Sequence, residues 1–182
     1  MPERHRQVAE ELLVAFRSGK EKAFDFFFRR YYAALCYYAS RYIKHCPAAE
    51  DVVSESFIQL WNHREKIESE NHLRNWLYKV VYHGCLRLRE RQLAVSNGHK
   101  ELNKISDEEE IEFFENIIKA ETMRQLNEAM NQLPNQCRKI FFKLYIEGKS
   151  VKEVAEELKL TASTIKNQKA RGIKLLRIRL SS

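Results

Sequence analysis

The sequence predicts an all-α protein made of two small helical domains joined by an acidic linker. Gly and Pro are scarce, at 5 and 3 of 182 residues, whereas a fold of short strands and tight turns uses many of both. Hydrophobic residues make up 44% of the chain and recur at helical spacing, which supplies apolar faces for compact cores. The charge also changes sign twice along the chain, which indicates two basic parts with an acidic stretch between them.

The charge profile sets the expected domain boundaries. Residues 1–91 carry 16 Lys and Arg against 12 Asp and Glu, residues 92–121 carry 3 against 8, and residues 122–182 carry 13 against 5. The middle stretch includes Ser, Asn and Gly at 96–98 and four consecutive acids at 107–110, a composition that resists burial. We expect a first domain over 1–92, an acidic linker over 93–119 and a second domain over 120–182.

Three helices are expected in the first domain. Residues 24–42 are apolar on most sides, which is typical of a buried helix. Pro47 interrupts this pattern, and residues 49–66 then carry an apolar stripe opposite a polar face. Residues 72–92 combine a further apolar stripe with five cations: Arg74, Lys79, Arg87, Arg89 and Arg91.

The far end of the acidic linker recovers a helical pattern. Its apolar positions are Ile111, Phe114, Ile118, Met123, Leu126 and Met130. We therefore expect the second domain to begin before residue 122.

The sequence of the second domain predicts a helix-turn-helix. Leu133 and Pro134 end one helix, and residues 136–147 form the next. Ser150 stands three residues before Glu153, which matches a capping box for a helix over 151–158. A short turn leads to a last helix over 162–180, capped by Thr161 or Ser163.

The last helix has the chemistry of a DNA-reading helix. Its inward stripe is Ile165, Gly172, Ile173 and Leu176. Its outward face is Ser163, Lys166, Asn167, Ala170, Arg171 and Lys174. In the major groove Asn pairs with adenine and Arg with guanine, while Lys neutralises phosphates and helix N-terminal amides bind them. The alternative is a solvated basic face on an ordinary helical hairpin.

Composition and motifs argue against several other classes. A net charge of +7 and a pI near 9.2 draw the chain toward polyanions. There is no apolar run of transmembrane length and no export signal at the N-terminus, so we expect a cytoplasmic protein without membrane insertion. The six His and four Cys are dispersed, and no Gly-rich phosphate loop or nucleophile and base set appears. We expect no enzyme, metal, cofactor or small-molecule substrate.

Three segments carry a resemblance to a known family. The segment LPNQCRKIFFKLYIEGKSVKEVAEELKLTASTIKNQKARGIKLLR resembles the promoter-binding C-terminal domain of extracytoplasmic-function (ECF) sigma factors. AEDVVSESFIQLW is similar to the family's polymerase-binding helix, and LRNWLYKVVYHGCLRLRER to its −10 segment. The resemblance spans residues 23–180, and it looks most like the branch common in Bacteroidetes-type bacteria. It implies a sigma factor that binds core RNA polymerase and directs it to promoters.

The resemblance also implies roles for individual residues. Contacts to the clamp helices of the polymerase's largest subunit are implied for Asp51, Ser54, Glu55, Phe57 and Trp61. Contacts to the −10 element, where aromatics stack on unpaired bases and cations follow phosphates, are implied for Tyr78, Lys79, Tyr82, His83, Arg87 and Arg89. Contacts to the −35 element are implied for Thr161, Ser163, Thr164, Lys166, Asn167, Lys169, Ala170, Arg171 and Lys174. Trp76, in the −10 segment, is expected in the core.

Several positions depart from the family pattern. His83 stands where Asn is usual, Arg87 where Asp is frequent and Ser54 where Gln is common, so the base preference at the −10 element is open. Lys159 replaces the usual turn Gly, which costs free energy if the backbone keeps a positive φ. Lys169 replaces a semi-buried Leu, so we expect its ammonium to extend toward phosphate.

The resemblance further implies an anti-sigma partner, and association with the nucleoid while bound to polymerase. Two alternative functions remain at this point: a stand-alone helix-turn-helix regulator, which would bind duplex DNA without polymerase, and a helical adaptor, which would bind no DNA.

Overall fold

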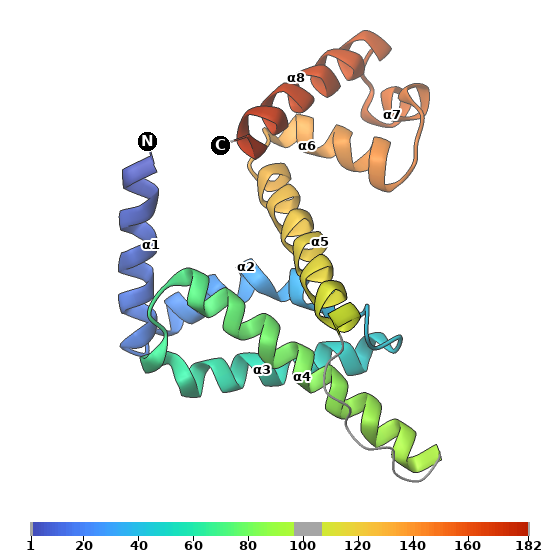
Figure 1. Ribbon diagram of the computed structural model, residues 1–182. Coiled ribbons are helices and arrows are strands. Elements are labelled where there is room, and N and C mark those ends of the chain that lie inside the picture. The colour runs from blue at the N-terminus through green and yellow to red at the C-terminus, as the bar shows by residue number, and fades with distance from the viewer. Residues whose placement is uncertain (1, 97–106, 182) are drawn as a thin grey trace. The chain divides into compact units, whose positions relative to one another are not determined.

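The structure, a computed structural model, describes residues 2–96 and 107–181, and every element in these ranges is helical (Figure 1). The chain divides into two compact units, residues 1–121 and 122–182. The predicted all-α, two-domain fold is therefore confirmed. Residues 97–106 of the expected linker lie outside the described residues.

The first unit begins with a helix that the sequence analysis did not predict, at residues 2–17. Its Leu13 and Phe16 are buried in the core, and Gly19, with a φ of +78°, turns the chain into the next helix. The elements of this unit are α1 (Pro2–Arg17), α2 (Glu21–Ala39), α3 (Cys46–His63), the 3-10 turn η1 (Arg64–Lys66), α4 (Glu70–Ser96) and the first part of α5 (Asp107–Asn131).

Helix α2 lies at the centre of this unit, in contact with α1, α3 and α4. Its buried stripe is Phe27, Tyr31, Leu35 and Tyr38, spaced by three or four residues. α3 supplies Val53, Phe57 and Leu60 to the same core, and α4 supplies Leu73, Leu77 and Val81. Fully burying a side chain of this size stabilises the fold by roughly 1.5–3 kcal/mol, so this cluster holds the three helices together.

The face that helix α5 buries is not the apolar stripe that the sequence predicts. Phe113, Ile117 and Ala120 pack against the core of the first unit. Four apolar residues of the predicted stripe are exposed instead: Ile111, Phe114, Ile118 and Met123. The face that is buried also carries Asn116 and Glu121, whose polar groups bond tyrosine hydroxyls and so tolerate burial. Part of the expected linker is thus helix that belongs to the first unit.

The second unit is smaller and contains the rest of α5, α6 (Asn135–Phe141), the π-helical turn η2 (Phe142–Ile146), α7 (Val151–Leu158) and α8 (Ala162–Leu180). One buried cluster joins α5, α6 and α8 through Ala129, Leu133, Cys137, Phe141 and Leu176. A second joins α6, α7 and α8 through Ile140, Val154, Ala155 and Ile165. These clusters fix the angle between the last two helices.

Candidate nucleic-acid and protein interfaces

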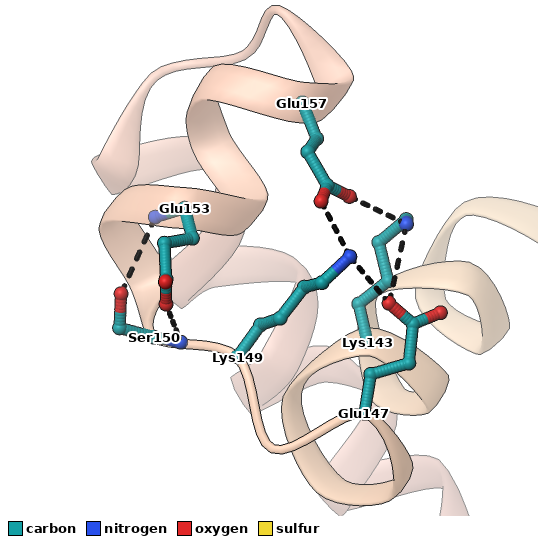
Figure 2. Close-up of polar contacts among 6 residues, drawn as sticks. All are labelled: Lys143, Glu147, Lys149, Ser150, Glu153 and Glu157. Atoms are coloured by element: carbon teal, nitrogen blue, oxygen red, sulfur yellow. Dashed lines mark hydrogen bonds and ion pairs between the residues drawn. The ribbon is translucent and has the colours of Figure 1, made fainter.

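Helices α7 and α8 form a helix-turn-helix whose ends are all capped. The Glu153 amide donates to Ser150 Oγ at 3.3 Å, and the Ser150 amide donates to Glu153 Oε2 at 2.7 Å, which is the predicted capping box (Figure 2). Lys159 ends α7 in the left-handed conformation, at φ 52° and ψ 45°. The Thr164 amide donates to Thr161 Oγ1 at 3.1 Å, so Thr161 is the cap of α8.

The outward face of α8 is open to solvent as predicted. All six residues expected on it are exposed: Ser163, Lys166, Asn167, Ala170, Arg171 and Lys174. The helix carries six Lys and Arg and no Asp or Glu. Thr161 at its start is exposed, and Thr164 is half-buried. This surface therefore combines hydrogen-bonding side chains with a dense positive charge.

A glycine lets α8 approach α6. A Cβ at Gly172 would lie 2.4 Å from Cε2 of Phe141, closer than carbon atoms can pack. Phe141 is itself buried between the two helices. Gly172 thus sets how deeply the recognition helix sits in its own unit.

Lys169, expected to extend its ammonium toward phosphate, lies beside an aromatic ring in the free protein. Its Nζ lies 5.2 Å from the ring centroid of Tyr145, a cation–π distance. The neighbouring Gln168 accepts a hydrogen bond from the Cys137 thiol at 3.0 Å. The substituted lysine therefore packs on an aromatic ring of the second unit, and its contact with phosphate stays a prediction.

A four-residue ion cluster ties α7 to η2 and to the turn between them (Figure 2). The Lys143 ammonium lies 2.6 Å from Glu157 and 3.5 Å from Glu147. The Lys149 ammonium lies 2.6 Å from Glu147 and also contacts Glu157. Hydrogen bonds from Lys143 and Lys149 lower the pKa of Glu157, and hydrogen bonds to Glu147 and Glu157 raise the pKa of Lys149. Each carboxylate thus bridges two ammonium groups.

In the first unit, α3 presents an acidic face. Asp51, Ser54 and Glu55 are exposed and lie within about one helical turn of one another, as the sequence analysis expected of a docking surface. α3 contains three acidic residues and no Lys or Arg. Ile58 is 62% exposed on the next turn, an apolar surface residue that the sequence analysis missed. Its position three residues after Glu55 is the signal that could have identified it.

Two other residues assigned to this docking surface differ in exposure: the burial of Phe57 corrects its assignment, whereas Trp61 keeps partial exposure. Phe57 is only 1% exposed, with its ring 4.8 Å from that of Phe28 in the core. Trp61 is half-buried, in edge contact with Phe24, and the guanidinium of Arg64 lies over its ring at 4.9 Å. Both follow the apolar stripe of α3; Phe57 supports the exposed face from the core, and the contact implied for Trp61 stays a prediction.

Helix α4 exposes most of the cations assigned to the −10 element. Lys79, His83, Arg87 and Arg89 are all exposed. Partial burial, together with the charges of Lys79 and Arg87, lowers the pKa of His83, so its imidazole is neutral at pH 7. Trp76 is half-buried and stacks on His63 at 5.2 Å, which fits its expected place in the core.

Tyr78 and Tyr82, the two aromatics assigned to base stacking, are buried instead. Tyr78 is 0% exposed, and its hydroxyl donates to Glu121 Oε1 at 2.8 Å. Tyr82 is 6% exposed and meets the ring of Phe113 edge-on at 5.0 Å. Their side of α4 faces α2 and the first part of α5, so neither ring is accessible to a base in this structure. The start of α5, expected from the sequence to be part of the linker, covers this side of α4.

Within residues 2–96 and 107–181, no group of His, Cys, Asp and Glu side chains is arranged to hold a metal ion. None of the helices in that part of the chain has the length and apolar character needed to span a membrane. All four cysteines are free thiols, with Cys85 and Cys137 buried.

Comparison with known families explains why two helical units occur together. The family Sigma-70 region 2 matches residues 27–94, and Sigma-70 region 4 matches residues 123–176. One match falls in each structural unit, in the order that the resemblance predicted. The chain belongs to the sigma-70 family.

Alignments with related sigma factors cover most of the chain. RNA polymerase sigma factor SigV of Bacillus subtilis is 26% identical over 147 residues, covering 79% of this chain and 82% of the relative. ECF RNA polymerase sigma factor SigM of Mycobacterium tuberculosis is 24% identical over 170 residues, covering 93% and 83%. The co-crystal structure of the sigma factor RpoE with the anti-sigma factor NepR from Bartonella quintana aligns over 88% of this chain and 98% of that one, with 20% identity and a TM-score of 0.35.

The family matches and the ECF sequence relatives confirm the recognition of an ECF sigma factor. The chain is a transcription initiation factor that binds core RNA polymerase and directs it to promoters. Sigma factors are initiation factors rather than enzymes. The likeness to the Bacteroidetes branch stays a prediction.

Proposed function

We propose that this sigma factor divides its contacts among three helices. The exposed acidic face of α3 docks on the clamp helices of the polymerase's largest subunit, the cations of α4 engage the −10 element, and the outward face of α8 reads the −35 element. The first unit, residues 1–121, serves as the polymerase-binding and −10 domain, and the second unit, residues 122–182, serves as the −35-reading domain. The chain has no catalytic activity of its own.

The observation that carries this proposal is the opposite charge of two exposed helix faces in different units. The face of α3 is acidic and complements cations on a protein partner. The charged residues of α8 are all cations, which complement a polyanion. A regulator that binds duplex DNA alone has no use for the acidic face of α3. Each unit offers a small surface, so tight promoter binding requires polymerase to hold both against one DNA.

From the family resemblance, the proposal also includes an anti-sigma factor that covers one or more of these faces. We further propose that the protein works in the cytoplasm and joins the nucleoid when bound to polymerase.

Two substitutions with separable effects test this division of contacts between α3 and α8. Asp51→Arg reverses a charge on α3 and is expected to weaken binding to core polymerase at least tenfold, while binding of a −35 duplex stays unchanged. Arg171→Ala removes a base-reading side chain from α8. It is expected to weaken binding of the −35 duplex roughly tenfold, with binding to core polymerase intact. Fluorescence anisotropy measures both.

Matched controls are exposed residues of α1: Glu11→Arg for the charge reversal and Arg17→Ala for the arginine. Wild-type core affinity in Asp51→Arg would contradict the docking assignment. Specific binding of a whole promoter by the wild-type chain alone, as tight as with core polymerase present, would favour the stand-alone regulator instead.

A further inference from the structure

Arg64, the first residue of η1, lies over the ring of Trp61 at the end of α3. The central carbon of its guanidinium is 4.9 Å from the ring centroid, which is a cation–π distance. Its Nη1 donates a hydrogen bond to the Trp61 carbonyl oxygen at 2.9 Å, and its Nη2 lies 3.8 Å from the Glu65 carboxylate. A cation that bonds one of the last carbonyls of a helix also stabilises the helix end. Arg64 therefore holds both the ring and the backbone of Trp61.

Two further helices of the first unit also hold the Trp61 ring. Phe16 of α1 meets this ring edge-on with the ring centroids 6.1 Å apart, and Phe24 of α2 meets it edge-on at 5.3 Å. Aromatic pairs in this geometry stabilise each other beyond the area that they bury. Together with Arg64, α1 and α2 thus fix the orientation of a ring that is still partly exposed.

The turn between α1 and α2 covers the guanidinium of Arg64. Gly19 in this turn has a φ of +78°, and a Cβ at this position would lie 3.6 Å from Arg64 Nε and 3.9 Å from Cη2 of Trp61. Arg64 Nε is buried, and it has no hydrogen-bond partner among the residues that the structure describes. A buried donor without a partner costs stability, and an apolar side chain would fill the same place without that cost. The stability of the fold alone therefore does not explain an arginine at this position.

Trp61 continues the exposed face of α3. Ser54, Ile58 and Trp61 are four and then three residues apart, so they follow one another along one side of the helix. Ser54 and Ile58 are exposed, and Trp61 is partly so. A side chain that is already held in one conformation loses less freedom when a partner covers it. A fixed Trp61 ring thus adds contact area to this face at little cost in entropy.

We propose that Arg64 is a positioning residue for polymerase docking, and that it holds the Trp61 ring in the orientation in which the clamp helices meet it. Arg64 acts through Trp61 rather than by a contact of its own with polymerase. This inference rests on the proposed docking role of α3. It also gives α1 a part in that role, because Phe16 and the turn at Gly19 close over the same ring and guanidinium.

The experiment compares Arg64→Met with Arg64→Lys in the full chain. Methionine is flexible and fills an irregular space without a charge or an N–H donor, whereas lysine keeps a cation that can lie over the ring. Affinity for core polymerase is measured by fluorescence anisotropy of the labelled chain, and stability by the midpoint of urea unfolding. Motion of the Trp61 ring is measured by the nanosecond anisotropy decay of its own fluorescence, with Trp76→Phe as the background.

Two control variants separate positioning from stability and from the docking role itself. Tyr31→Phe removes the hydrogen bond from the Tyr31 hydroxyl to Glu70 Oε1, at 2.8 Å between α2 and α4. It is expected to lower the unfolding midpoint and to leave core affinity unchanged. Asp51→Arg reverses a charge on the docking face. If Asp51→Arg keeps wild-type core affinity, the proposed docking role fails, and this inference fails with it.

Arg64→Met is expected to weaken core binding roughly fivefold and to increase the fast motion of the Trp61 ring, with an unfolding midpoint close to that of the wild type. Arg64→Lys should keep most of the affinity and the restricted ring motion. Wild-type core affinity in Arg64→Met overturns the proposal, and so does an equal loss of affinity in Tyr31→Phe. A weaker affinity with unchanged ring motion overturns it as well, because Arg64 would then contact polymerase directly.

Discussion

The hydroxyl of Tyr78 in α4 donates a hydrogen bond to Oε1 of Glu121 in α5, at 2.8 Å and across 43 positions of sequence. Both side chains are buried. Close by, the Asn116 amide donates to the Tyr42 hydroxyl at 3.2 Å, and Phe113 packs on Tyr82. These contacts hold the first part of α5 on the first unit and keep two tyrosines of α4 away from solvent.

Replacing Tyr78 with Phe is expected to destabilise the first unit by about 1–3 kcal/mol. The change keeps the ring and removes a donor from a buried carboxylate, which is the costly direction for a buried hydrogen bond. Urea unfolding followed by tryptophan fluorescence measures this, because both tryptophans, Trp61 and Trp76, belong to the first unit. Tyr37→Phe, at an exposed tyrosine of α2, is the control, and equal midpoints for the two variants would contradict the assigned role of this bond.

Replacing Lys159 with Gly is expected to stabilise the second unit. Lys159 has a φ of +52°, where a Cβ costs roughly 1–2 kcal/mol and Gly is unstrained, although Gly also gains freedom in the unfolded chain. A net gain of about 1 kcal/mol slows amide hydrogen exchange in α7 and α8 roughly fivefold. Lys159→Ala removes the same charge but keeps the Cβ. If the two variants gained equally, the backbone strain would not be the cause.

Replacing Gly172 with Ala is expected to push α8 away from α6. The new methyl group would lie 2.4 Å from a ring carbon of Phe141, and overpacking of this kind costs roughly 1–3 kcal/mol. The −35 duplex should also bind more weakly because the recognition helix is displaced. Combining Gly172→Ala with Phe141→Leu makes room for the methyl group, so the double variant should lose less stability than the two single losses added together. If the two losses of stability simply added in the double variant, the contact between Gly172 and Phe141 would be contradicted.

The second unit is expected to lose stability in acid. Hydrogen bonds from Lys149, Ser150 and Lys143 lower the pKa values of Glu147, Glu153 and Glu157, respectively, below the ordinary 4.5. Carboxylates with a depressed folded-state pKa contribute stability that is fully present above their unfolded-state pKa. That contribution is lost as the pH falls through the folded-state values.

Circular dichroism of thermal unfolding between pH 7 and pH 3 measures this loss. The second unit of wild type should hold its midpoint down to about pH 4.5 and fall below it. Glu157→Gln, which removes one of the titrating groups, should show a shallower fall, and high salt should reduce the difference between the two proteins. Glu156→Gln, an exposed neighbour outside the ion cluster, serves as the control. Parallel curves for Glu157→Gln and wild type would show that the cluster does not contribute.

Sequence reasoning succeeded where the signal is local. The capping box at Ser150 and the exposed face of α8 both follow from residues within a few positions of one another. The docking of α5 could not be predicted in this way, because it depends on partners such as Tyr78 and Glu121 that lie far apart in sequence.

The same distinction explains the misplaced site residues. The resemblance implies roles for Phe57 and Tyr78 by aligning positions, but it does not show which face of a helix is covered in this chain. The ion cluster was missed for a similar reason: Lys143 and Glu147 are four apart on one helix, but Lys143 and Glu157 meet only because the chain turns between them.

The most direct test of this account is multi-template transcription in vitro with core RNA polymerase and the full chain on genomic DNA of its host. We expect specific transcripts whose start sites share two sequence blocks at the −35 and −10 positions, and we expect Asp51→Arg to abolish them. No specific transcript from wild-type protein, under conditions where a known sigma factor is active with the same core enzyme, would contradict it.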